Sequence, residues 1–391
     1  MLNTKFSPWP SFTQKEAEAV KNVLLSNKVN YWTGNECREF EKEFAEWVDC
    51  DYAVALANGT LALDVALKAL GVTDGDEVIT TPRTFLASAS SIVTAGASPV
   101  FADVDLNSQA ITAESIEAVL TEKTKAVIVV HLAGMPAEMD AIMALSAKHG
   151  FYVIEDCAQA HGAKYKGRSV GTIGHIGAWS FCQDKIMTTG GEGGMVTTNN
   201  EKLWSFMWSY KDHGKNYDSI YNKEHPPGFR WLHDSFGTNW RMTEMQAVIG
   251  RIQLTYMQEW ATSRQSNAKA IDDAVSDLNV VRRVVVPEYS EHAEYKHYMF
   301  ICPEHLKPGW SRDKIVDAIV ERGVPAYQGS CSEVYLEKAF DGTSFRPETL
   351  LKNAVELGET SLMFLVHPTL TDNEVYKTTE VLRKVLLEAQ V

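Results

Sequence analysis

The sequence of 391 residues lacks the features that mark membrane, secreted, metal-binding and nucleic-acid-binding chains. No apolar stretch reaches about 18 residues, and the first residues show no basic segment followed by an apolar run, so we expect a cytoplasmic protein. The six cysteines contain no C-x-x-C pair and the eleven histidines no H-E-x-x-H motif, which excludes the usual patterns for zinc sites and disulfide frameworks. A formal net charge of −14 argues against a nucleic-acid partner, because binding phosphate backbones requires an excess of Lys and Arg.

Nucleotide-binding glycine motifs are also missing. The glycines at 171, 174 and 177 do not have the Gly-x-Gly-x-x-Gly spacing of a dinucleotide fold, and no Gly-Lys-Ser/Thr follows Gly190 and Gly191. A nicotinamide-dependent dehydrogenase is therefore a poorly supported alternative.

What the sequence does contain is an alternation of strand-length apolar runs and helical stretches. This pattern predicts an α/β fold with a mostly parallel sheet covered by helices. Because the chain is longer than one hydrophobic core usually supports, we predict a large domain over residues 1–264 and a smaller C-terminal α/β domain over residues 265–391. Seven strands are expected in the large domain, at Tyr52–Ala57, Glu77–Thr80, Pro99–Ala102, Ala126–His131, Tyr152–Glu155, Ala178–Phe181 and Gly194–Thr197.

Three helices and one long loop are predicted around these strands. Thr13 and Glu16 have capping-box spacing before an amphipathic stretch, Phe40 and Phe44 mark a second helix, and a long helical pattern follows Thr243. Residues 217–238 show no clear period and are rich in Gly, Pro, aromatic and basic residues, which is typical of a functional loop.

Asp156 follows the apolar run of residues 151–154 and would therefore lie at the carboxyl edge of the sheet, where open α/β folds bind ligands. A carboxylate there could keep a pyridinium nitrogen protonated. Taken alone, the residue would more simply be read as a cap of the next helix.

Lys185 lies 29 positions further on and can reach the same edge. A primary amine condenses with an aldehyde to form a Schiff base, which an arginine cannot do. Most lysines are simply exposed, but this one follows an apolar strand and precedes the glycine-rich run Gly190-Gly191-Glu192-Gly193-Gly194, where the backbone can approach a ligand closely.

A phosphate cradle is predicted where Asn58-Gly59-Thr60 joins a strand to a helix. Backbone N–H groups at a helix N-terminus, helped by the Thr60 hydroxyl, form an anion site, and Ser180 could add a second hydroxyl. Asn58-Gly59 could also be only a turn.

Taken together, these motifs resemble the DegT/DnrJ/EryC1/StrS group of sugar aminotransferases, which have the type I pyridoxal-phosphate fold. The resemblance spans nearly the whole chain and includes the stretches at residues 31–34, 40–44, 57–63, 82–85, 155–159, 180–185, 191–194 and 237–242.

The resemblance implies pyridoxal 5'-phosphate as the cofactor. Lys185 would form the Schiff base, Asp156 would pair with the pyridine nitrogen and Gln159 would lie near the phenolic oxygen. Gly59, Thr60 and Ser180 would hold the phosphate, and Phe85 would stack on the ring. Asn239 would reach the phosphate from the other subunit, which implies a homodimer with shared active sites.

For the reaction, the resemblance implies transfer of an amino group from glutamate or glutamine to a keto-sugar. The run from Ser180 to Gly194 is most similar to members that aminate the 8-keto form of the lipopolysaccharide sugar Kdo, giving 8-amino-3,8-dideoxy-manno-octulosonate (Kdo8N). A nucleotide-linked 3- or 4-keto-6-deoxyhexose is the alternative acceptor, and a non-catalytic regulatory protein on the same fold is an alternative of another class.

Substrate contacts are expected from basic and aromatic residues, because a sugar that bears an anion suits cations among rings. Arg83, Tyr31, His213 and Arg230 are the candidates. The last two belong to a basic stretch with aromatic residues between its cations: Lys211, His213, Lys215, Lys223, His225, Arg230, His233 and Arg241, among Tyr217, Tyr221, Phe229, Trp231 and Trp240. Each could instead belong to a solvated loop or a dimer contact.

Overall fold

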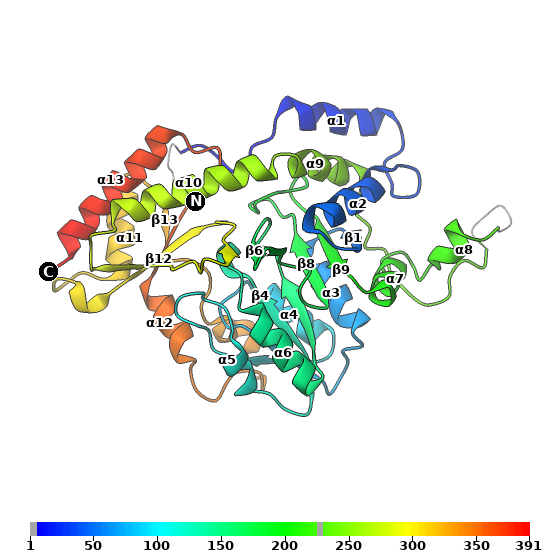
Figure 1. The fold of residues 1–391 in the computed structure, drawn as a ribbon, viewed down its shortest axis with the longest axis horizontal. Coiled ribbons are helices and arrows are strands. Elements are labelled where there is room, and N and C mark those ends of the chain that lie inside the picture. Colours follow the sequence, from blue (N-terminus) through cyan, green and yellow to red (C-terminus); the bar gives the residue numbers. More distant parts are fainter. Residues whose placement is uncertain (1–5, 225–229) are drawn as a thin grey trace.

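A seven-stranded sheet organises the larger part of the molecule (Figure 1). The computed structural model describes residues 6–224 and 230–391. The spatial order of the strands is β1-β9-β8-β5-β4-β2-β3, and β9 alone runs antiparallel to its two neighbours. The strands are β1 (Tyr52–Leu56), β2 (Glu77–Thr80), β3 (Ser98–Phe101), β4 (Thr124–Val130), β5 (Tyr152–Asp156), β8 (Ile176–Ser180) and β9 (Gly194–Thr198). All seven predicted strands are confirmed, with ends shifted by one or two residues.

Both faces of this sheet are buried, which explains why its strands read as apolar runs. Side chains alternate along a strand, so Ile128 on β4 packs on one face while Val127 and Val129 pack on the other. One face is covered by α3 (Gly59–Ala69), α4 (Ala87–Thr94) and α7 (Glu201–Tyr210). The other is covered by α2 (Glu36–Val48), α5 (Ala113–Glu117), α6 (Met139–His149) and α9 (Glu244–Leu254).

The predicted helices are present. Thr13 caps α1 (Gln14–Leu25) in a capping box with Glu16, and α2 carries Phe40 and Phe44 into the core. The long pattern after Thr243 is divided between α9 and α10 (Met257–Ala274). The predicted loop contains one short helix, α8 (Tyr217–Tyr221).

A second, antiparallel sheet of order β10-β12-β14-β13 lies in the C-terminal portion. Its core is shared with α10, α11 (Arg312–Glu321) and α13 (Asp372–Ala389). The strand β14 directly follows α12 (Lys352–Thr360) in the chain. The strands are β10 (Val281–Arg283), β12 (His297–Ile301), β13 (Ala326–Tyr327) and β14 (Ser361–Phe364). A small three-stranded sheet joins β6 (Lys164–Tyr165), β7 (Arg168–Ser169) and β11 (Ser290–Glu291).

The predicted α/β class with a smaller C-terminal α/β portion is therefore confirmed. Helix α10 runs unbroken through the expected boundary at residues 264 and 265 (Figure 1), so that exact boundary stays a prediction. Among the described residues, no helix is both long and apolar enough to span a membrane.

Glu155 fixes the connection between β5 and β8 from inside the core. Its fully buried carboxylate accepts hydrogen bonds from the backbone N–H groups of Gly171, Ile173 and Gly174 at 2.6–2.8 Å. His131 Nε2 lies 3.0 Å from the same carboxylate, and His131 Nδ1 accepts the Ala137 N–H, so Nε2 carries the proton. Burial alone would raise the pKa of Glu155, but His131 and the amide donors outweigh it and hold the pKa below its usual value.

We expect Glu155→Gln to lower the free energy of unfolding by about 2–4 kcal/mol, because an amide NH₂ would face N–H donors at a fully buried position. Urea denaturation at fixed protein concentration measures this change. The matched control is Glu46→Gln on exposed α2 surface, which should change stability by no more than about 0.5 kcal/mol. Equal midpoints for the two variants would contradict the proposed role of Glu155.

Candidate active site

A cavity of about 740 Å³ opens at the carboxyl edge of the large sheet. Asp156 ends β5, Ser180 ends β8 and Val130 ends β4, and all three line this cavity. Strands β4, β5 and β8 are parallel, so their C-terminal ends meet at one edge, as expected for ligand sites in open α/β folds. Residues 295, 296, 298, 329 and 330, from the C-terminal portion, also line this cavity.

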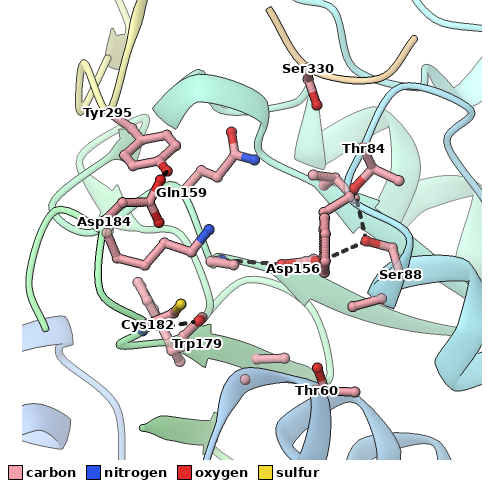
Figure 2. A pocket seen from close by; sticks show the side chains of 18 of the residues that line it. Thr60, Thr84, Ser88, Asp156, Gln159, Trp179, Cys182, Asp184, Tyr295 and Ser330 are labelled. Carbon is pink, nitrogen blue, oxygen red and sulfur yellow. Dashed lines mark hydrogen bonds between the residues drawn. The ribbon is translucent and has the colours of Figure 1, made fainter. Parts of the chain in front are cut away.

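The Asp156 carboxylate is 6% exposed and lies at the floor of the cavity (Figure 2). One oxygen accepts a hydrogen bond from Ser88 Oγ at 2.8 Å, and the other accepts the Ala158 N–H at 3.1 Å. Thr84 Oγ1 lies 2.9 Å from Ser88 Oγ and extends the network. Burial raises the pKa of Asp156 against the opposing effect of Ser88 and Ala158, so a cation placed against this carboxylate would find an under-compensated negative charge.

Lys185 lines the same cavity as Asp156. Its Nζ lies 5.2 Å from the centre of the Tyr295 ring. The Tyr295 hydroxyl donates to Asp184, and Trp9 Nε1 donates to the Lys185 carbonyl at 2.8 Å. The lysine backbone is thus held from two sides while the amine stays within the cavity.

The N-terminus of α3 faces the cavity and has the form of an anion site. The Asn58 side chain accepts the Leu61 N–H at 3.0 Å, while the Gly59 and Thr60 amides have no acceptor among the described residues. A Cβ on Gly59 would lie 2.5 Å from the Ser180 Cβ, so glycine is required for the two segments to approach. The predicted cradle of Gly59, Thr60 and Ser180 is therefore brought together at one end of the cavity.

Gln159 and Phe85 present an amide and an open ring to the cavity. Gln159 Oε1 accepts the Ala133 N–H at 2.8 Å, which leaves the Nε2 group to donate into the cavity. Phe85 is 70% exposed although it is a large apolar side chain, and it lines the same cavity. A flat aromatic ligand between these groups would cover the Phe85 face.

Five predicted residues lie outside the cavity lining of the single chain. Arg83 is fully buried, donates from Nε to Gln109 at 3.0 Å and has its guanidinium 5.6 Å from the centre of the Tyr298 ring. It therefore lies behind the cavity wall, because the turn that exposes Phe85 directs Arg83 inward. Tyr31 is buried between Glu41 and Trp208. His213, Arg230 and Asn239 are exposed.

Much of the predicted basic stretch is engaged within its own chain. Lys211 is buried and pairs with Glu41 at 2.7 Å, and both Lys215 and Arg241 pair with Asp212. Trp231 and Phe236 are 90% and 99% exposed. His225 and Phe229 lie outside the described residues.

Sequence reasoning missed Ser88, Tyr295, Lys296 and Ser330, all of which line the cavity. Ser88 is the side-chain donor to Asp156, and Tyr295 lies beside the reactive lysine. They come from α4 and from a segment more than a hundred residues after Lys185. The run Tyr295-Lys296-His297-Tyr298 was a usable signal, because it places polar and aromatic residues at the start of an apolar strand.

The arrangement fits pyridoxal phosphate on its own geometry. Four groups converge on one cavity: a buried carboxylate, an amine, a helix N-terminus kept open by glycine and an exposed aromatic ring. These groups correspond to the pyridine nitrogen, the aldehyde, the phosphate and the ring face of that cofactor.

Comparison with known proteins agrees with the geometry. Residues 10–383 match the DegT/DnrJ/EryC1/StrS aminotransferase family. The chain is 39% identical over 274 residues to GDP-perosamine synthase of Escherichia coli O157:H7, covering 70% of this chain and 72% of that one. It is 35% identical to a UDP-N-acetyl-3-dehydro-alpha-D-glucosamine 3-aminotransferase of Acidithiobacillus ferrooxidans, covering 93% and 92%. An aminotransferase structure from Psychrobacter cryohalolentis is 62% identical with a TM-score of 0.96, covering 98% and 99%. The chain therefore belongs to the DegT/DnrJ/EryC1/StrS family and is a pyridoxal-phosphate-dependent sugar aminotransferase.

Proposed function

We propose that the chain transfers the amino group of glutamate or glutamine to a keto-sugar that bears an anionic group. The observation that carries this proposal is the convergence of Lys185 and Asp156 on one cavity with the open N-terminus of α3. One amine, one buried carboxylate and one anion site are what a reversible amine transfer on this cofactor requires.

Each residue then has a separate task. The Gly59 and Thr60 amides with Ser180 bind the phosphate, and Phe85 covers one ring face. Asp156 keeps the ring nitrogen protonated, because its buried charge is stabilised by a cation at that atom. When bound, the cofactor supplies an electron-accepting ring for the charge left on the substrate carbon. Lys185 Nζ would hold the cofactor covalently and would also move the proton to and from that carbon.

For the acceptor we propose the 8-keto form of Kdo, which would give Kdo8N for lipopolysaccharide. The feature in favour is the run from Ser180 to Gly194. A nucleotide-linked keto-hexose is the second candidate, because two relatives are named for GDP- and UDP-linked sugars.

We further propose a cytoplasmic homodimer in which Asn239 enters the partner's active site. Asn239 is exposed and outside the cavity of its own chain. Trp231 and Phe236 leave large apolar surface uncovered, and such surface is typical of interfaces.

Lys185→Ala should remove the covalent link to the cofactor and abolish turnover, because it deletes the only group proposed to form that link. The thermal midpoint should stay close to that of the unchanged protein without cofactor, since the Lys185 side chain is only partly buried. Borohydride reduction followed by peptide mapping locates the linked lysine. Cofactor found on Lys296, the other lysine that lines the cavity, would overturn the assignment.

Mixing inactive Lys185→Ala with inactive Asn239→Asp should restore about a quarter of the original activity. With random exchange, half of the dimers are mixed and half of their sites carry both native residues. Subunit exchange is verified by native mass spectrometry. Exchange without recovered activity would exclude a site shared in this way.

Arg230→Ala should raise the KM for the keto-sugar about tenfold to a hundredfold, as expected for one lost charge-assisted hydrogen bond. The half-reaction with glutamate should be unchanged. Arg283→Ala, an exposed arginine on β10 that does not line the cavity, is the matched control. In the same assay, amination of the 8-keto octulosonate but not of nucleotide-linked keto-hexoses would support the Kdo acceptor, and the opposite preference would exclude it.

A further inference from the structure

A second lysine, Lys296, lines the cavity that holds Lys185. It stands immediately before β12, where side chains alternate between two faces. His297 turns away to Asp272 and Glu294 at 3.1 and 3.2 Å, whereas Tyr298 also lines the cavity. The strand therefore directs Lys296 toward the cavity.

Among the described residues, the Lys296 ammonium has no hydrogen-bond or ion-pair partner. Its Nζ lies 4.8 Å from the centre of the Tyr295 ring, and the Lys185 Nζ lies 5.2 Å from the centre of the same ring. The two amines thus flank one aromatic side chain.

The charges around Lys296 are predominantly positive. Asp184 is the nearby carboxylate, and it already accepts the Tyr295 hydroxyl. Arg264 is buried and donates to the Glu294 and Tyr295 carbonyls at 3.3 and 3.2 Å, not to a carboxylate. Burial lowers the pKa of Lys296 to about 8, with Asp184 opposing this shift and Arg264 and Lys185 adding to it. An anion from solution would relieve this excess of positive charge.

We propose that Lys296 binds the carboxylate adjacent to the amine of the amino-acid donor. In an amino-acid donor, this carboxylate is two bonds from the amine nitrogen. Because the amine must react at the position of Lys185, the carboxylate must lie beside Lys185. The anion of an octulosonate or of a nucleotide-linked sugar is separated from the keto carbon by most of the sugar. Proximity to Lys185 therefore selects the donor, and the inference rests on the proposed amino-acid donor.

The test uses the full-length enzyme with its cofactor, and the variants Lys296→Met and Lys296→Arg. Methionine keeps the length and apolar stem, and arginine keeps the charge. Loss of the visible cofactor band on mixing with L-glutamate reports the donor half-reaction. We expect Lys296→Met to require ten- to a hundredfold more glutamate for half-maximal rate and Lys296→Arg to restore most of the loss.

4-Aminobutyrate is the matched substrate, because it keeps the amine and distal carboxylate of glutamate but lacks the carboxylate next to the amine. The unchanged enzyme should prefer glutamate at least tenfold, and Lys296→Met should lose that preference. An equal loss for both amines would assign Lys296 to cofactor placement or to the distal carboxylate, and would overturn the proposal.

Calorimetric binding of glutarate, a dicarboxylate without an amine, gives a readout independent of turnover. Asp184, Arg264, Lys185, Tyr295 and His367 surround Lys296 in every variant. Burial lowers the pKa of His367 to about 3, so this histidine does not titrate in the range tested. Between pH 7 and 9 the dissociation constant should rise about tenfold in the unchanged enzyme, as an ammonium with a pKa of about 8 loses its proton, but not in Lys296→Arg. The same rise in both would remove Lys296 as the cause.

The two proposals fail separately. The keto-sugar half-reaction, measured from the aminated cofactor, should change less than threefold in Lys296→Met. If that half-reaction alone is impaired, Lys296 serves the acceptor and the donor proposal is wrong. If the unchanged enzyme aminates no keto-sugar but still reacts with glutamate, the proposed acceptor is wrong. The role of Lys296 in donor binding is then still decided by the glutamate measurements.

Discussion

Asp156 places a carboxylate, 6% exposed, at the end of a central strand. Removing a charge from water is costly unless it is hydrogen-bonded and paired, and the described residues supply two donors, Ser88 and the Ala158 amide, but no ion pair. A cation in the cavity would supply further stabilisation. A protonated pyridine nitrogen would meet that need, so under the proposed function the buried carboxylate and the cofactor would stabilise each other. The position of this one group would then fix the position of the ring, and with it the positions of the amine, the phosphate site and the Phe85 face.

The adjacent residue shows how the chain keeps this edge of the sheet rigid. Glu155 is as buried as Asp156 but points to the other face, where three backbone amides and His131 surround it. Strand alternation explains the division, because successive side chains must face opposite sides. One carboxylate therefore anchors the connection to β8, and the next remains available to a ligand.

Much of this arrangement could be predicted from sequence because its signals are local. Strands buried on both faces appear as short apolar runs, so all seven strands of the large sheet were predictable, as was the capping box at Thr13. Pairings of two-residue strands such as β11 with β6 depend on contacts more than a hundred residues apart, and no local pattern marks them. Ser88, Tyr295 and Lys296 likewise reach the cavity through the packing of segments that are far apart in the sequence, so no local pattern marks them as cavity residues. Arg83 shows that closeness in sequence can also mislead. It is two residues from Phe85, but the turn between them places Arg83 behind the cavity wall.

The net charge of −14 does not prevent the cavity from accepting anions. Charges on the outer surface are screened over about 8–10 Å of salt solution, whereas groups inside a cavity interact through little water. Around Lys296, Arg264 and Lys185 add positive charge and Asp184 opposes them, while Asp156 and Glu192 also line the cavity. Arg264 donates to two carbonyl groups and makes no hydrogen bond to a carboxylate among the described residues. Lys185 and Lys296 come from parts of the sequence more than a hundred residues apart, so the charge around these amines is a property of the fold and is not visible in the composition of the chain.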